Sequence, residues 1–600
     1  MNHLQHILFY CLIILLGIGG NKLEAQVPLV LGDLIEKDLK PGDKHDYQVE
    51  LTNGQFFFAS LMGYNFDMIV SVFDPAGNQI HEFDDNGIAG EFIRIHAHQT
   101  GTYQITISPY VRERESGRYE LEVIKLQTSA SNKEEKIDEL CSFWEGSKGE
   151  EVPGIAIALV KDGTCIYQKE YGKANLEYRI PLSSSSVFDL ASLAKQFTGM
   201  AIALLIDQGK LTLKDDVRTF IPELPEFEDQ ILIEDLIYHK SGLRGIGGLF
   251  SIGNFGSSTT YGEQVTAETV LEALKTQQEL NFPVGTEHSY SNTGYILLAI
   301  VIERITGMTF REWMQKHIFE PLEMTHSFAN DNPDELIPHR ATAYYYLNGK
   351  MAYRQENGMA LIGSSAIYST TDDLVKWVNN FDHPIVGNES VFEMMHSRGR
   401  LLNGEEIDYG FGVNIRNFKG LQMIEHSGYT HPGFQTNIAR FPDQHFSVIL
   451  LSNWADLNPV DVIAKYIPAI YLEEFIPPQK PKPAPNPPIA EHPSEDPGNN
   501  APPQESQIEK EDVDLHTYAG YYYSPELRII YELVIDEERL FVSGPNAGET
   551  ELEVVYKDYF RSPTGFFDEV RFERGDNQQI IGFRVSQGQR TRHLRFDKWR

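Results

Sequence analysis

Cysteine and positive charge are both scarce in this sequence of 600 residues. It has 3 cysteines, and its 51 lysines and arginines are outnumbered by 86 aspartates and glutamates, for a formal net charge of −35. Cys11 lies in the apolar amino-terminal segment, which leaves Cys141 and Cys165, too few and too far apart for a disulfide framework. We expect both to be unpaired. The negative charge would repel a phosphate backbone and argues against nucleic acid as a partner.

Long apolar runs are missing after the first residues. Residues 7–16 form an apolar run, followed by glycines and by Leu23-Glu24-Ala25, which resembles a small-residue cleavage site. The run is short for a membrane span. We interpret residues 1–25 as a secretory signal peptide, with an uncleaved anchor as the alternative. The sequence thus predicts an exported protein, periplasmic or extracellular, with no stable membrane span once the signal is removed.

Shifts in composition predict a multidomain chain. Residues 26–127 alternate short apolar runs with turn residues, which is typical of an antiparallel β-sandwich. Residues 137–475 mix helical and strand patterns and form the largest unit, a mixed α and β domain. Residues 476–512 are rich in proline and acid, as in an extended linker. Residues 513–600 contain strand-like runs that fit a small β-barrel, and no pattern in them indicates chemistry of their own.

The first candidate catalytic residues are Ser192 and Lys195. They stand at the start of an apolar run that stops at Gly209, a pattern that predicts a helix beginning near Ser192. Residues three apart share a helix face, so Lys195 would lie beside the Ser192 hydroxyl. A serine hydroxyl is a poor nucleophile at neutral pH and needs a base nearby. A Ser-x-x-Lys pattern alone is weak evidence, because both residue types are common.

Further motifs follow Ser192 in a fixed order. Tyr290 and Asn292 flank Ser291, and residues two apart in an extended loop point the same way, so both can face one cleft. His426-Ser427-Gly428 comes before an apolar strand at 446–451. Between and around these lie Gly209–Leu213, Asp215–Val217, Pro222–Pro225, His239–Leu243, Pro283–Thr286, Glu320–Met324 and Ser369–Leu374. The ordered set resembles the serine β-lactamase and penicillin-binding-protein superfamily, of the class C and peptidase S12 type.

This resemblance implies a fold for residues 137–475, an antiparallel sheet flanked by helices beside a helical subdomain. The flanking segments show weaker likenesses. Residues 26–127 resemble the pre-peptidase C-terminal domain family in Gly54-Gln55, in the turn 74–77 and in Gly101-Thr102-Tyr103. Residues 513–600 resemble the lipocalin-like domains appended to some penicillin-binding-protein-like peptidases. The resemblance implies no metal and no organic cofactor.

The resemblance also implies roles for the candidate residues. Ser192 would be acylated, Tyr290 would return a proton to the leaving group, and Asn292 would hydrogen-bond the substrate's amide. His426 would anchor the substrate and tune Tyr290. The N–H groups of Ser192 and Tyr429 would form the oxyanion hole, and Gly428 would let the chain approach the ligand. The general base is either Lys195, if desolvation lowers its pKa, or Tyr290, if the lysine's charge favours the phenolate.

The reaction so indicated is acyl transfer on a small peptide, amide or ester, such as a cell-wall fragment. Efficient β-lactamases and DD-peptidases of this type resemble one another in a lysine at the third motif, whereas His426 would supply that charge only in part near neutral pH. We therefore expect a peptidase or amidase acting on small peptides that contain D-amino acids. The alternatives are an esterase, a β-lactamase and a non-catalytic binding or assembly protein that keeps the fold.

Two departures from the family pattern would bear on specificity. Lys240 stands where the His-Thr-Ser-Gly-Leu pattern has threonine, and the residues between Arg340 and Gly363 follow no recognisable pattern.

Overall fold

The computed structural model describes residues 27–477 and 513–599 apart from short internal stretches, and the chain divides into two compact units between residues 136 and 137. The stretches outside the description are 65–66, 84–90, 111–115, 142–143, 145–150, 254–264, 348–349, 354–358, 431–432, 456–458, 546–547 and 564–565. The predicted signal peptide and nearly all of the predicted linker lie outside the described residues. Cys141 is buried and Cys165 half-buried, and no disulfide joins them in the described part, as expected.

The first unit is built from two antiparallel sheets that share one apolar core, with a short parallel pair at one edge. One sheet has the order β1 (Val27–Pro28), β3 (His45–Leu51), β8 (Gly101–Pro109), β5 (Met68–Phe73), β6 (Gln79–Phe83). The other has the order β2 (Leu34–Leu39), β9 (Gly117–Thr128), β4 (Gln55–Tyr64), β7 (Glu91–His96). Alternate residues point inward, such as Val49 and Ile105 from the first sheet and Ala59 and Leu121 from the second, and pack together. The predicted β-sandwich is confirmed.

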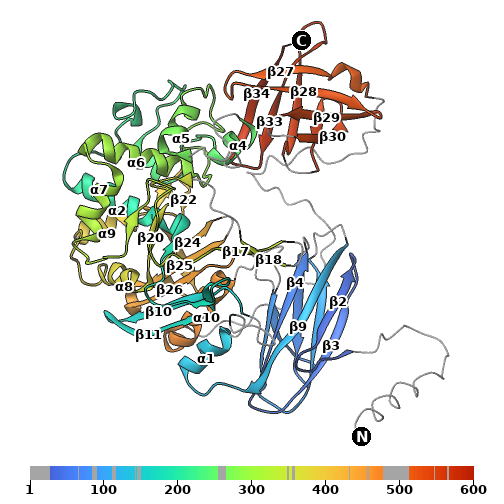
Figure 1. Cartoon of the computed structure of the whole chain (residues 1–600), viewed down its shortest axis with the longest axis vertical. Helices are drawn as coiled ribbons and strands as arrows, with labels where there is room; N and C mark the ends of the chain where they lie inside the picture. The colour runs from blue at the N-terminus through green and yellow to red at the C-terminus, as the bar shows by residue number, and fades with distance from the viewer. Residues whose placement is uncertain are drawn as a thin grey trace, which may run out of the picture. The chain divides into compact units, whose positions relative to one another are not determined.

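The second unit contains a six-stranded antiparallel sheet with helices on both faces (Figure 1). Its order is β11 (Thr164–Tyr171), β10 (Ile155–Lys161), β26 (Phe446–Ser452), β25 (Phe434–Phe441), β24 (Leu421–Thr430), β23 (Asn414–Phe418). Ile155 and Ile157 of β10 pack with α10 (Pro459–Tyr471), whereas Ala156 and Ala158 belong to the core on the other face. The period of two thus gives each face its own core.

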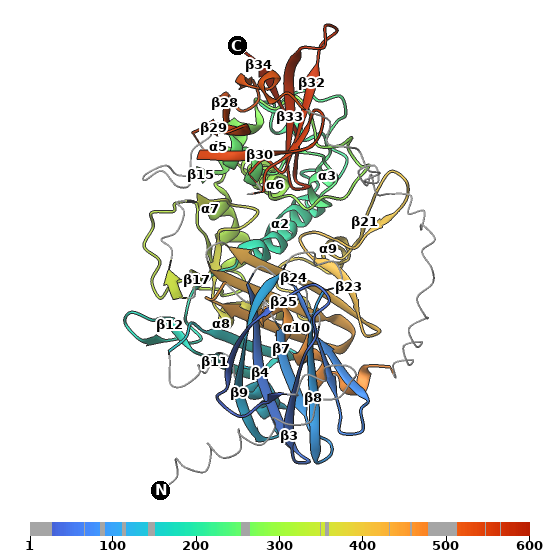
Figure 2. The ribbon, with the colours of Figure 1, turned by 90° about the vertical axis from the view of Figure 1, so that its right-hand side faces the viewer.

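Helices fill the space beyond that second face. The 3₁₀ turn η2 (Ala191–Ala194) leads into α2 (Lys195–Asp207), which runs between α6 (Asn292–Thr306) and the sheet (Figure 2). The other helices here are α3 (Ile233–Ile237), α4 (Ile246–Ile252), α5 (Ala267–Leu274), α7 (Phe310–Met314), α8 (Thr371–Asn379) and α9 (Glu389–Met395). No single helix in the described ranges is long and apolar enough to cross a membrane; α6 passes that test only jointly with Phe310–Phe319, across a bend of 79°.

Short strands complete this part of the unit. They pair as β14 (Phe188–Asp189) with β20 (Ile367–Ser369) and β16 (Phe328–Ala329), β12 (Lys173–Asn175) with β13 (Ile180–Pro181), β15 (Val265–Thr266) with β19 (Met359–Ala360), β17 (Tyr344–Leu347) with β18 (Lys350–Tyr353), and β21 (Gly399–Arg400) with β22 (Glu406–Ile407).

The carboxy-terminal strands close into an eight-stranded antiparallel barrel. They are β27 (Gly520–Ser524), β28 (Ile529–Asp536), β29 (Arg539–Gly544), β30 (Gly548–Tyr556), β31 (Tyr559–Arg561), β32 (Glu569–Arg574), β33 (Ile580–Gln587) and β34 (Thr591–Lys598). Aromatic side chains fill the interior, for example Phe583 and Phe596 with ring centroids 4.8 Å apart. The barrel interior and the helical core form one continuous cluster of buried residues. The predicted fold class, an α/β core of the β-lactamase type between two β domains, is confirmed.

Candidate active site

The turn that carries Ser192 is held in an unusual backbone conformation. Ala191 has a φ of 52°, which is uncommon for a residue with a side chain, and its N–H donates to Asp189 Oδ1 at 2.8 Å. The chain then enters η2 and α2, and Gly209 takes a φ of 68° just after the helix ends. The helix predicted from Ser192 thus begins as a 3₁₀ turn, and Lys195 is the first residue of α2.

Lys195 is completely buried and touches three oxygen atoms. Its Nζ lies 3.1 Å from Ser192 Oγ, 2.7 Å from Asn292 Oδ1 and 2.9 Å from the Ser364 carbonyl oxygen. Burial lowers the pKa of Lys195 well below its usual range, and the nearby Arg590 guanidinium lowers it further. A neutral amine has two N–H groups and one lone pair. In that form both N–H groups would go to the amide and carbonyl oxygens, which can only accept, and the lone pair would face Ser192.

Tyr290 lies over the same amine. Lys195 Nζ is 4.8 Å from the Tyr290 ring centroid, and the Tyr290 hydroxyl is buried with no hydrogen-bond partner in the described part of the chain. Burial raises the pKa of Tyr290, although the nearby Ser192 hydroxyl and Arg590 guanidinium oppose that shift. Tyr290 therefore keeps its proton at neutral pH. Tyr290 and Asn292 both lie at Lys195.

His426 is buried on β24 in a fixed tautomer. Its Nδ1 lies 2.6 Å from the Ser427 carbonyl oxygen, which can only accept, so Nδ1 carries the proton and Nε2 accepts from the Tyr409 hydroxyl at 3.0 Å. Burial lowers the pKa of His426 to about 3. The side chain is neutral at pH 7. Desolvation therefore disfavours the partial positive charge that the sequence suggested at this position, although the Ser427 carbonyl stabilises the cation.

Gly428 brings β24 against the nucleophile turn. A Cβ on Gly428 would lie 2.2 Å from the Leu190 carbonyl oxygen and 2.3 Å from Thr436 Oγ1, which itself donates to that carbonyl at 2.8 Å. The absence of a side chain at Gly428 thus allows β24 to pack closely against the turn. The sequence had suggested close approach to a ligand instead. The next residue, Tyr429, has a side chain that is 55% exposed.

The structure adds a backbone acceptor, the Ser364 carbonyl, which the sequence did not reveal. Gly363 takes a φ of 85°, and a Cβ there would lie 2.3 Å from the Tyr295 carbonyl oxygen of α6. Thr198 Oγ1 of α2 donates to the Gly363 carbonyl at 2.8 Å. This tight turn sets Ser364 between the two helices. The Gly-Ser-Ser sequence at 363–365 was the only hint of this turn, because the residues before it follow no family pattern.

Two further side chains near the site had no assigned role. The His239 ring lies against Tyr290 at a tilt of 45°, with centroids 4.5 Å apart. Its Nδ1 accepts from the Ser291 N–H at 3.1 Å, which fixes the loop between Tyr290 and Asn292. Lys240, by contrast, donates to Glu234 at 2.8 Å and lies 3.3 Å from Asp235. The cation at the family's threonine position is thus held by α3.

The sequence model of the β-lactamase family matches residues 143–472, more than half of the chain. The chain belongs to this family. It is similar to penicillin-binding protein 4* of Bacillus subtilis (strain 168), with 31% identity over 315 residues, covering 50% of this chain and 67% of the relative. It is also similar to a D-aminopeptidase of Gluconobacter oxydans (strain 621H), with 26% identity over 307 residues, covering 50% of this chain and 56% of that protein.

Among solved structures, the octameric penicillin-binding protein homologue from Pyrococcus abyssi aligns with a TM-score of 0.49 and 24% identity, covering 78% of this chain and 99% of the other. The family to which the chain belongs, with relatives named as a penicillin-binding protein and a D-aminopeptidase, is one of serine hydrolases.

Proposed function

We propose that this protein hydrolyses small peptides or amides that contain D-amino acids, through an acyl-enzyme on Ser192. The observation that carries the proposal is the contact between Ser192 Oγ and Lys195 Nζ at 3.1 Å, with the two N–H groups of a neutral Lys195 committed to Asn292 and Ser364. A buried lone pair aimed at a serine hydroxyl is what a general base needs.

In the acylation step, Lys195 takes the proton of the Ser192 hydroxyl while Oγ attacks the substrate's carbonyl carbon. The tetrahedral oxyanion would be met by the N–H groups of Ser192 and Tyr429, as the family resemblance implies. The proton on Lys195 then reaches the leaving nitrogen through the Tyr290 hydroxyl, which gives up its own proton and takes the one from the lysine. The carbon–nitrogen bond breaks, and the amine leaves with one added hydrogen.

Deacylation reverses the roles. A water molecule enters where the amine left, passes one proton toward Tyr290 and Lys195, and attacks the ester carbonyl. The proton returns to Ser192 Oγ as the acid product departs. The environment supports this division of labour, because burial lowers the pKa of Lys195 and raises that of Tyr290. We therefore favour Lys195 as the base and Tyr290 as the proton donor.

The substrate class is supported by the relative named as a D-aminopeptidase. His426 also supports it, because efficient β-lactamases of this type have a lysine at this third motif. An esterase and a β-lactamase of the same fold use the same chemistry on other acyl groups and are the alternatives.

The test begins with the intact mass of the protein after incubation with a fluorophosphonate, followed by peptide mapping. We expect one adduct, on Ser192, in the wild type and in Ser390→Ala, an exposed serine on α9, and none in Ser192→Ala. Turnover is then compared on D-alanine p-nitroanilide, its L-enantiomer, p-nitrophenyl acetate and a penicillin. The proposal predicts cleavage of the D-anilide in preference to the L-form.

The other outcomes point to the alternatives. Cleavage of the acetate ester without the D-anilide indicates an esterase, and rapid loss of penicillin absorbance indicates a β-lactamase. A folded wild-type protein that takes up no label at Ser192 contradicts the enzyme proposal and favours a binding or assembly protein. We also propose that the protein is exported, which amino-terminal sequencing of the mature form after expression in a bacterial host tests directly.

A further inference from the structure

The carboxy-terminal barrel places an arginine beside the active-site tyrosine. Arg590 lies in the turn between β33 and β34, and its guanidinium carbon is 5.2 Å from the Tyr290 ring centroid. It is exposed, and no described carboxylate forms an ion pair with it. Its charge acts on Lys195, Tyr290 and His239. A cation from the barrel is therefore part of the electrostatic environment of the nucleophile.

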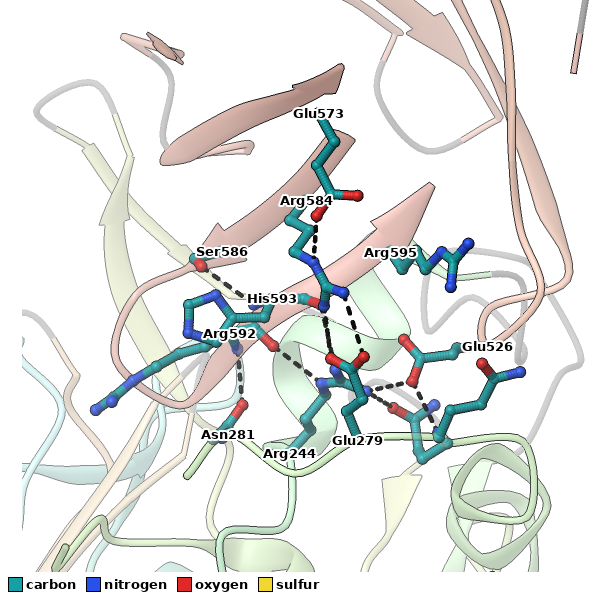
Figure 3. A network of polar contacts seen from close by, with 12 residues as sticks. Arg244, Glu279, Asn281, Glu526, Glu573, Arg584, Ser586, Arg592, His593 and Arg595 are labelled. Carbon is teal, nitrogen blue, oxygen red and sulfur yellow. Dashed lines mark hydrogen bonds and ion pairs between the residues drawn. The ribbon is translucent and has the colours of Figure 1, made fainter. Parts of the chain in front are cut away.

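The backbone at Arg590 is held firmly against the catalytic domain. The Arg590 carbonyl accepts from the Gly245 N–H at 2.6 Å and from Asn281 Nδ2 at 2.9 Å, and the next residue, Thr591, donates through Oγ1 to the Gly245 carbonyl at 3.0 Å. Asn281 Oδ1 also accepts from the Arg592 N–H at 2.7 Å (Figure 3). These bonds fix the backbone from which the Arg590 side chain extends, and none of them involves its guanidinium.

The neighbouring arginines differ in being committed to acidic partners. Arg244 is buried against Glu526 at 2.7 Å, and Arg584 pairs with Glu279 at 2.5 Å (Figure 3). Arg592 pairs with Glu287 at 3.0 Å. Each of them holds the barrel to the catalytic domain. Arg590 reaches past this network toward Tyr290 without a carboxylate of its own, which is the arrangement of a cation that awaits one from a ligand.

The other basic groups near the site are either disfavoured as cations or already paired with acidic side chains. Burial lowers the pKa of both Lys195 and His426, which disfavours a positive charge on either. Arg416 lies 3.1 Å from Glu425, and Lys240 is held by Glu234 and Asp235. A guanidinium binds a carboxylate through two parallel N–H groups, which gives both orientation and affinity.

We propose that Arg590 binds the carboxylate of the substrate's leaving group, so that the barrel completes the substrate site and selects peptides with a free terminal carboxylate. The leaving-group side is indicated because Arg590 lies at Tyr290, the residue that delivers the proton to the departing nitrogen. The inference rests on the proposed function for the position of that nitrogen. Arg590 is thus a binding and specificity residue, supplied about 400 residues after the nucleophile in the chain.

The test measures binding without turnover. Isothermal titration calorimetry on Ser192→Ala compares N-acetyl-D-alanyl-D-alanine with its carboxy-terminal amide. We expect the carboxylate form to bind about tenfold more tightly, the scale of one charge-assisted hydrogen bond to a partly exposed arginine. Adding Arg590→Gln should reduce the ratio of the two dissociation constants to near one, and Arg590→Lys should restore part of it. Arg595→Gln is the matched control, because this arginine of β34 pairs with Asp597 at 2.7 Å.

Each result decides the matter. A carboxylate preference that survives Arg590→Gln, or a Ser192→Ala protein that shows no preference or binds neither ligand, overturns the inference. The turnover assays of the proposed function are independent of it. A protein that prefers the carboxylate through Arg590 but cleaves no D-peptide refutes the proposed function alone, and one that cleaves D-peptides with no Arg590-dependent preference refutes this inference alone.

Discussion

Lys195 illustrates how a single buried side chain sets the chemistry of its surroundings. An ammonium at this depth would need a carboxylate partner, and no ion pair to Lys195 exists among the described residues. The neutral form instead satisfies both of its N–H groups with oxygen acceptors and keeps one lone pair for Ser192. The activity should therefore depend on the protonation of this one amine.

The first prediction concerns pH. Lys195 acts as a base only when deprotonated, so kcat/KM should be high above its lowered pKa and should fall as the pH falls through it. Arg590 disfavours the ammonium, so Arg590→Gln should raise that pKa and move the acid limb of the profile to higher pH. Rate profiles on p-nitrophenyl acetate would measure this, with Arg595→Gln as the control. An acid limb that does not move in Arg590→Gln would contradict the electrostatic coupling.

The second prediction concerns Tyr290. Tyr290→Phe removes the hydroxyl proposed as the proton donor and leaves the ring in contact with His239. An amide needs a protonated leaving group and should lose about 10²- to 10⁴-fold in kcat, whereas a p-nitrophenyl ester needs little protonation and should lose far less. Comparing the two substrates separates proton delivery from a general structural defect. Tyr178→Phe, at a side chain that is 81% exposed, should leave both rates unchanged.

At the scale of elements, the site depends on how closely strand β24 approaches the nucleophile turn. Gly428→Ala would force a Cβ into the Leu190 carbonyl oxygen and Thr436 Oγ1, at 2.2 and 2.3 Å. We expect the strand to shift, with a loss of about 1–3 kcal/mol in the free energy of unfolding and a slower reaction of Ser192 with fluorophosphonate. Thermal melts and labelling rates measure both effects. Normal labelling in a stable Gly428→Ala protein would show that the close approach is dispensable.

The same elements show what could be read from the sequence. The helix after Ser192, the pairing of Tyr290 with Asn292 and the three-part β, α/β, β architecture follow from local periodicity and ordered motifs, and these predictions agree with the structure. The role of the Ser364 carbonyl as an acceptor could not be predicted, because every residue has a backbone carbonyl. Only the turn at Gly363 directs this one toward Lys195. The neutrality of His426 was invisible because it depends on burial by distant segments. Arg590 required knowledge of how the barrel docks.

At the scale of the whole molecule, the catalytic domain and the barrel share a tightly fitted contact at α4. A Cβ on Gly248 would lie 2.3 Å from Thr591 Oγ1, whereas a Cβ on the adjacent Gly247 would meet nothing within 4 Å. A methyl group therefore fits at Gly247 but not at Gly248. The same glycine-to-alanine substitution at the two positions tests how the barrel docks.

The fourth prediction uses this pair. Gly248→Ala should push the β33–β34 hairpin away from α4, lower the melting temperature and reduce the carboxylate preference that Arg590 is proposed to confer. Gly247→Ala should keep that preference and raise stability by about 0.5–1 kcal/mol, because alanine favours the helix more than glycine does. Calorimetric melts and the paired ligands above supply both measurements. Equal behaviour of the two variants would show that the packing at Thr591 does not govern the position of Arg590.

The position of Arg590 in the sequence also sets the order in which the residues of the site are synthesised. A ribosome makes the chain from residue 1 onward, and domains near the amino terminus generally fold first. The ribosome makes the five residues of the candidate site before the linker and Arg590 after it. The five are Ser192, Lys195, Tyr290, Asn292 and His426. A nascent or prematurely terminated chain can therefore hold the whole nucleophilic apparatus before it holds the cation at Tyr290. The residues proposed to form the acyl-enzyme are therefore translated before the arginine proposed to select the substrate.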